Sequence, residues 1–157
     1  MRSFLKSWGL VIVWAVVIFS FSTNRFSFSN TDRIIRPLVR WIFPHASLEL
    51  QESIHFLVRK SGHWTEYFIF SLLLLRAFRD QKRNEWQGGS AIWTLILVLF
   101  YALSDELHQA FVPSRSAHFS DSMLDFLGGS CAVFWKYLRR NRRLTASSTK
   151  DEKSPEA

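Results

Sequence analysis

The chain contains four long apolar segments, and these constrain its fold more than any other feature. They cover residues 8–22, 62–78, 86–111 and 119–138, and no charged residue occurs from Trp86 to Ser104. A helix that spans a bilayer needs about 20 mostly apolar residues. We therefore predict an all-α fold, an integral membrane bundle of about four transmembrane helices.

The first and last segments each need a further argument. Arg2 and Lys6 precede the first segment, as in a signal peptide, but no small-residue cleavage site follows it, which favours an uncleaved anchor. The last segment is free of charge only from 126 to 135. It contains Gly128 and Ala132, a spacing of small residues that lets helices approach closely. We expect close helix packing there.

The basic residues predict how the helices are oriented. If the N-terminus is inside, thirteen of the 20 Lys and Arg residues lie on the inner side, in the N-terminal stub, the loop 76–85 and the chain from Lys136 onward. Seven lie outside, most of them in the long loop 23–61. Cytoplasmic loops carry an excess of Lys and Arg, so we predict that both termini are cytoplasmic.

The net charge of +7 and the isoelectric point near 10.1 raise the question of nucleic-acid binding. The basic residues flank apolar segments and form no stripe on a soluble face, which argues against that class. Seven Trp residues fit a chain in contact with lipid. Cys131 is the single cysteine and excludes an internal disulfide. We expect membrane lipids as partners and no nucleic acid.

The loop between the first two segments has its own pattern. Residues 31–43 and 47–60 place apolar residues at near-helical spacing, although Pro37 and Pro44 interrupt the first piece and suggest two short turns. We predict an amphipathic outer loop that lies on the outer leaflet. The alternative is a loop packed over the helix ends. At the other end of the chain, the polar residues 144–157 predict a disordered cytoplasmic tail after a transmembrane domain of residues 1–143.

The predicted orientation gathers polar residues in the outer leaflet. They are His63, Glu66, Asp105, Glu106, His108, Gln109, Arg115, His118, Asp121 and Asp125. Spacings of three and four residues place those of each segment on one helix face. Ionisable groups inside a membrane cost about 2.5–3.5 kcal/mol each at the helix centre, so they pair with one another or face a cavity.

Each of these residues also has a structural explanation. Asp105 and Glu106 can end a helix at the headgroups, and Asp121 can cap the last helix. Arg115 can pair with Asp121 or with a lipid phosphate. Asp125 is different, because it lies a turn inside the membrane, where neither capping nor headgroup contact accounts for it. We therefore expect an extracytoplasmic polar site.

The chemistry of such a site stays open. Carboxylates and histidine offer ligands for a divalent metal, and closely spaced acids suit general acid–base work. An arginine offers a planar fork for phosphate or carboxylate. The chain contains no HExxH, no Cys/His zinc pattern, no GxSxG and no phosphate loop.

The stretches KSGHWTEYFIFSLLL (60–74) and SDELHQAFVPSRSAHFSDSMLDFLGG (104–129), with IFSFS (18–22) before them, resemble the VanZ-like membrane proteins. That family is named for a protein associated with resistance to the glycopeptide teicoplanin. The residues that match its pattern are Lys60, His63, Tyr67, Asp105, Glu106, Gln109, Arg115, Asp121 and Gly128, with Ser20 and Ser22 in the first segment. Asp125 stands where the pattern often has Asn, and Ala132 where it has Gly.

The resemblance implies a multi-pass protein of the bacterial cytoplasmic membrane that acts in the cell envelope, with a link to teicoplanin resistance. Its outer-leaflet site is expected to bind an envelope precursor, a lipid headgroup or the lipoglycopeptide antibiotic. The expected binding residues are Lys60, His63, Glu66, Tyr67, Asp105, Glu106, Gln109, Arg115, Asp121 and Asp125. Among these, Lys60 and Arg115 would hold anionic oxygen.

A second hypothesis is a membrane-embedded hydrolase or transferase that acts on a lipid-linked substrate. Its catalytic candidates are Asp105, Glu106 and His63, and Arg115 would stabilise developing charge. A divalent metal is its candidate cofactor, with His63, Glu66, Asp105, Glu106 and Asp121 as candidate ligands. An ion-coupled carrier is disfavoured, because the charges crowd one leaflet.

Overall fold

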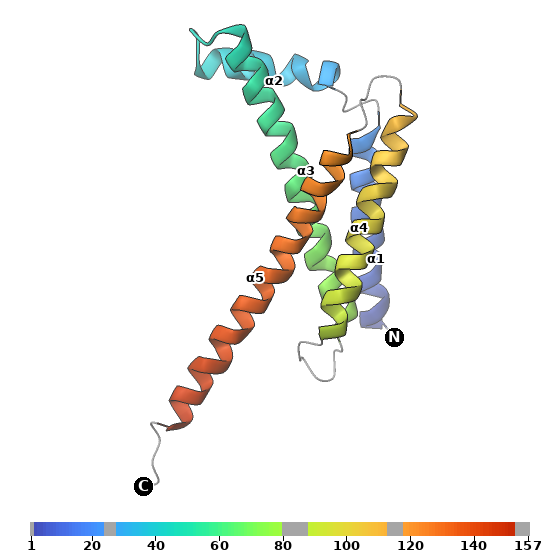
Figure 1. Cartoon of the computed structure of the whole chain (residues 1–157), viewed down its shortest axis with the longest axis vertical. Helices are drawn as coiled ribbons and strands as arrows, with labels where there is room; N and C mark the ends of the chain where they lie inside the picture. Colours follow the sequence, from blue (N-terminus) through green and yellow to red (C-terminus); the bar gives the residue numbers. More distant parts are fainter. Residues whose placement is uncertain (1, 24–27, 80–87, 113–117, 153–157) are drawn as a thin grey trace.

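A computed structural model describes residues 2–23, 28–79, 88–112 and 118–152, and within these ranges it contains five helices and no strand. They are α1 (Arg2–Ser22), α2 (Phe28–Ile42), α3 (Leu48–Phe78), α4 (Gly88–Ala110) and α5 (Phe119–Glu152). Figure 1 shows α1, α4, the second half of α3 and the first half of α5 gathered in a bundle, while the first half of α3 extends away from it and α2 lies across that end. The prediction of an all-α fold is confirmed.

Two of the described helices are long and apolar enough to cross a membrane. They are α1, over Leu5–Ser22, and α4, over Gly88–Ala110. These correspond to the first and third apolar segments. The other two predicted spans fall within α3 and α5, whose charged residues interrupt their apolar stretches. A bundle of four spans therefore stays a prediction.

The helix α3 lies at the centre of the fold and contacts each of the other four. The core is built around Tyr67, Phe70 and Leu74 of α3, which pack with Ile18 of α1 and Val98 of α4. All five side chains are nearly or fully inaccessible. Apolar burial of this kind holds the helices in register and fixes which of their faces meet.

Two hydrogen bonds between helices add direction to this packing. The indole N–H of Trp14 donates to the carbonyl oxygen of Glu66 at 3.0 Å, which ties α1 to α3. The hydroxyl of Tyr101 donates to the carbonyl oxygen of Ala15 at 2.7 Å, which ties α4 to α1. Aromatic side chains that carry a polar atom usually find such a partner when they are buried.

Small residues let α5 approach its neighbours closely. A Cβ on Gly128 would lie 2.4 Å from the carbonyl oxygen of Trp64 in α3, and a Cβ on Gly129 would lie 2.6 Å from a methyl carbon of Val98 in α4. Ala132, one turn further along, is fully buried. The close packing predicted from Gly128 and Ala132 is therefore confirmed.

The outer loop differs from its prediction in two respects. Pro37 lies inside α2 and does not divide it. A proline deprives the carbonyl four residues earlier of its partner, but that carbonyl belongs to Arg33, an exposed residue, so solvent can satisfy it. Residues 47–60 form no separate helix. They are the start of α3, which Ser47 caps by accepting the N–H of Leu50 at 3.2 Å.

The last helix continues to Glu152, whereas the sequence predicts a disordered tail from residue 144. Residues 144–152 contain no proline or glycine, so a polar composition alone does not end the helix. The domain boundary at residue 143 stays a prediction. Arg115 and residues 80–87, which include most of the inner loop 76–85, lie outside the described residues.

Candidate functional site

Three helices each contribute one side chain that could bind a metal ion, and the three side chains lie close together. His63 of α3, Asp105 of α4 and Asp125 of α5 place ligand atoms within 4.8 Å of one another. Nδ1 of His63 is 3.8 Å from Oδ1 of Asp125. Asp105 and Asp125 are only 4% and 2% exposed. Two carboxyl groups and an imidazole thus lie together in a largely buried region, and we call these three residues the polar triad.

Hydrogen bonds position Asp105 within the polar triad. The side-chain amide of Gln109 donates to Oδ2 of Asp105 at 3.0 Å, across the predicted four-residue spacing, and also lies 3.4 Å from the hydroxyl oxygen of Ser22. All three side chains are buried. The first helix therefore contributes to the site as well. Among the described residues, Ser22 is a site neighbour that helical spacing could not reveal, and the stretch IFSFS was its only signal.

Two polar atoms beside this network lack a hydrogen-bond partner among the described residues. They are the hydroxyl of Tyr67 and Oδ1 of Asp125, both buried. Tyr67 also lies within electrostatic range of Asp105, Asp125 and Glu66. A buried polar group without a partner costs about 1–3 kcal/mol, and such groups in a folded protein call for an explanation. Both atoms are available to a ligand.

The charged side chains at the edge of the site already have partners. Lys60 of α3 forms an ion pair with Asp121 of α5, and each side chain is 24% exposed. Glu106 accepts the backbone N–H of His118. In this arrangement Asp121 balances the charge that Lys60 was predicted to offer to a ligand. Arg115, the second predicted anion-binding residue, lies outside the described residues.

The predicted metal ligands divide into two groups. His63 and Asp105 belong to the polar triad, whereas Glu66, Glu106 and Asp121 do not. Asp125 takes the third position, although the sequence pointed to it only as a binding residue. Its place in α5, a turn inside the helix start, makes it the carboxylate that reaches the other two.

Two kinds of chemistry fit this arrangement. One imidazole nitrogen and two carboxylate oxygens suit a divalent transition metal, with open positions for water or substrate. Without a metal, two neighbouring carboxyl groups titrate as a coupled pair and can share a proton. Either role depends on Gln109 and Ser22, which fix the orientation of Asp105.

One protein family matches a range of the chain that includes all the residues of this site. The model of the VanZ/LLP1 family matches residues 7–139, from α1 through most of α5. No curated protein and no solved structure matches the chain. The matched range includes the residues of the polar triad, the ion pair at its edge and Ser22 of α1. The chain therefore belongs to the VanZ/LLP1 family.

Proposed function

We propose that this chain is a multi-pass protein of the bacterial cytoplasmic membrane, with both termini in the cytoplasm and the polar triad in the outer leaflet. Helix geometry supports this depth. An α-helix rises about 1.5 Å per residue, so His63 lies about 22 Å along α3 from Phe78. The hydrocarbon core is about 30 Å thick. If Phe78 marks its inner edge, the polar triad lies in its outer third.

The proposed function is to bind the polar headgroup of a lipid-linked envelope precursor, or a glycopeptide antibiotic such as teicoplanin. The observation that carries this proposal is the pair of buried polar atoms that have no hydrogen-bond partner among the described residues, Tyr67 Oη and Asp125 Oδ1. In lipid, an unsatisfied polar group is costly. A ligand that brings hydroxyl or amide groups would satisfy both atoms, and Lys60 at the edge offers a cation once it leaves Asp121.

The test is teicoplanin susceptibility of a sensitive bacterial host that carries the chain. We expect wild-type protein to raise resistance and Asp105→Asn to abolish the gain at equal abundance in the membrane. Glu52→Gln is the matched control, since Glu52 is an exposed acid of α3 far along the helix from the polar triad. If the wild type confers no resistance, the antibiotic is the wrong ligand, and envelope lipids become the substrates to test.

A second candidate function is a metal-assisted hydrolase or transferase. It is favoured by the three ligand atoms within 4.8 Å of one another. A metal there would activate water, and Asp105 or His63 would serve as ligand or as proton acceptor. Elemental analysis of the purified protein after loading with Zn²⁺ or Mn²⁺ tests this idea. We expect about one ion per chain, lost in His63→Gln and Asp125→Asn and kept in Glu52→Gln. Absence of a bound ion in the wild type would contradict it.

A further inference from the structure

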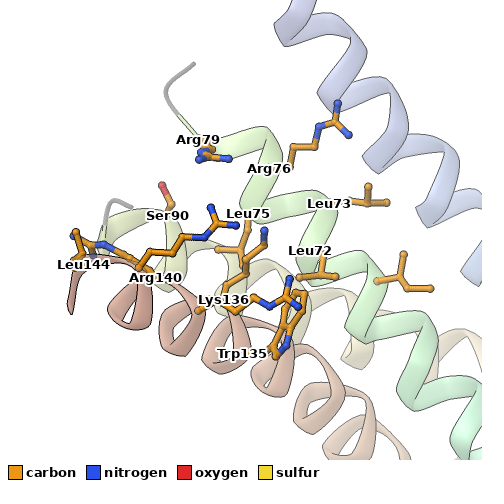
Figure 2. A pocket seen from close by; sticks show the side chains of 13 residues that line it. Leu72, Leu73, Leu75, Arg76, Arg79, Ser90, Trp135, Lys136, Arg140 and Leu144 are labelled. Atoms are coloured by element: carbon orange, nitrogen blue, oxygen red, sulfur yellow. The ribbon is translucent and has the colours of Figure 1, made fainter. Parts of the chain in front are cut away.

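A second site lies at the other end of the bundle, between α3 and α5. These helices diverge there, and a groove with a volume of about 820 Å³ opens between them, with Ser90 of α4 at its side. Figure 2 shows its lining and the extension of Arg140 from α5 toward α3. Six cationic side chains line this basic groove, which are Arg76, Arg79, Lys136, Arg139, Arg140 and Arg143.

Most of the cations in the basic groove form no ion pair with a carboxylate in the part of the chain that the structure describes. No described carboxylate forms an ion pair with Arg76, Lys136, Arg140 or Arg143. Arg139 lies over the ring of Trp135, 4.3 Å from its centre, which supplies no negative charge. Like charges gathered at one end of a bundle repel one another. An anion held between the two helices would remove that repulsion.

Part of the lining of the basic groove is apolar. Leu72 and Leu75 of α3 and Trp135 of α5 line it together with the cations, and we call these three side chains its apolar floor. A free inorganic anion would gain nothing from contact with these apolar side chains. An anionic lipid would, because its acyl chain can pack on the leucines while its headgroup binds the cations. Basic pockets between spanning helices are a known setting for anionic lipid headgroups.

We propose that the basic groove binds a membrane lipid with two phosphate groups. The cations come from both walls, with Arg76 and Arg79 on α3 and Lys136 and Arg140 on α5. One phosphate can therefore be held at each wall, and arginine binds phosphate through paired hydrogen bonds. This site is separate from the polar triad, and the proposal does not depend on the function of that triad.

Native mass spectrometry of the full-length protein in detergent tests the proposal, with cardiolipin as the two-phosphate lipid and phosphatidylglycerol at matched phosphate concentration. We expect cardiolipin to bind about tenfold more tightly, and Arg140→Gln to weaken it by about tenfold. Arg142→Gln is the matched control, because Arg142 is exposed, lies two residues away and does not line the groove. It should bind cardiolipin as the wild type does. Lys136→Gln repeats the test if Arg140→Gln does not accumulate.

Three outcomes would overturn the proposal. Equal affinity for both lipids would show that one phosphate is enough. An equal loss in Arg142→Gln would show attraction to overall surface charge and no site. Displacement of cardiolipin by equimolar inorganic pyrophosphate would show a site for a free anion, in which the apolar floor has no role.

Discussion

The backbone of Gly128 lies so close to the carbonyl oxygen of Trp64 that an added Cβ would come within 2.4 Å of that oxygen. The obstacle is the main chain of α3, which cannot rotate away as a flexible side chain can. Trp64 is next to His63, and Gly128 is three residues after Asp125. The contact that brings α3 and α5 together therefore also sets the separation of two members of the polar triad.

Gly128→Ala is expected to force these helices apart. Overpacking of this kind costs about 1–3 kcal/mol of the free energy of unfolding. Thermal unfolding in detergent measures the loss. Gly9→Ala is the control, since a Cβ on Gly9 of α1 would meet nothing within 4 Å, and alanine is the better helix former. Unchanged stability of Gly128→Ala beside Gly9→Ala would show that the close approach does not exist in the folded protein.

The ion pair of Lys60 and Asp121 should contribute modestly to stability. Both side chains are 24% exposed, and pairs of this kind are worth about 0.2–1 kcal/mol. A double-mutant cycle with Lys60→Met and Asp121→Asn isolates that coupling energy from the other contacts of each residue. Raising the salt concentration should reduce the coupling further. Additive effects of the two substitutions would mean that the pair contributes nothing.

His55 should make the attachment of α2 sensitive to pH. This side chain is 1% exposed, 3.2 Å from a carboxylate oxygen of Asp32 and 3.0 Å from the hydroxyl of Thr31. Burial lowers the pKa of His55 below its usual 6.5, Asp32 opposes that shift and Arg59 reinforces it. The unfolded chain then binds more protons below about pH 6.5, so the contribution to stability is complete above that pH and is lost as the pH falls toward the lowered pKa.

The measurement is the thermal midpoint of wild type and His55→Gln between about pH 7.5 and 5.5. We expect the wild type to lose more stability than the variant over this window. Equal slopes for the two proteins would exclude His55 as the titrating group.

The helix α2 should lie flat on the bilayer surface. Its apolar stripe is exposed, and it consists of Ile34, Leu38, Trp41 and Ile42, which are 53–80% exposed. An amphipathic helix of this type buries its apolar face at the headgroup boundary. In a Cys131→Ser background, a spin label at Ile34→Cys should be more accessible to oxygen than to a soluble nickel chelate. A label at Arg33→Cys should show the reverse, and equal access at both positions would contradict this placement.

Contacts within one helix could be predicted from the sequence, whereas contacts between helices largely could not. The four-residue spacing of Asp105 and Gln109 indicated a shared face, and a hydrogen bond joins them at 3.0 Å. Gln109 also reaches Ser22, 87 positions away along the chain. That approach depends on how α1 and α4 pack, which a periodic pattern does not encode.

The continuity of α3 and the basic groove show the same limit. The sequence predicted an outer loop that includes residues 47–60 and a separate spanning helix from residue 62, but one helix runs through both. In the sequence, Lys136 and Arg140 served only to predict which side of the membrane the C-terminal segment faces, because no motif around them indicates a binding site. They line a groove only because α5 diverges from α3, and that divergence belongs to the tertiary structure.

In the membrane placement proposed above, the length of α3 has a consequence for the surrounding lipid. Its 31 residues make a rod about 46 Å long, well beyond the thickness of a typical hydrocarbon core of about 30 Å. A helix of this length must tilt in the bilayer or project into water, and the length of the lipid acyl chains determines the extent of the tilt or projection. Lipids with longer acyl chains would place His63, Asp105 and Asp125 deeper in the hydrocarbon core. Lipids with shorter chains would place these three residues closer to water. Hydrophobic mismatch thereby becomes a physical control on the water content of the site.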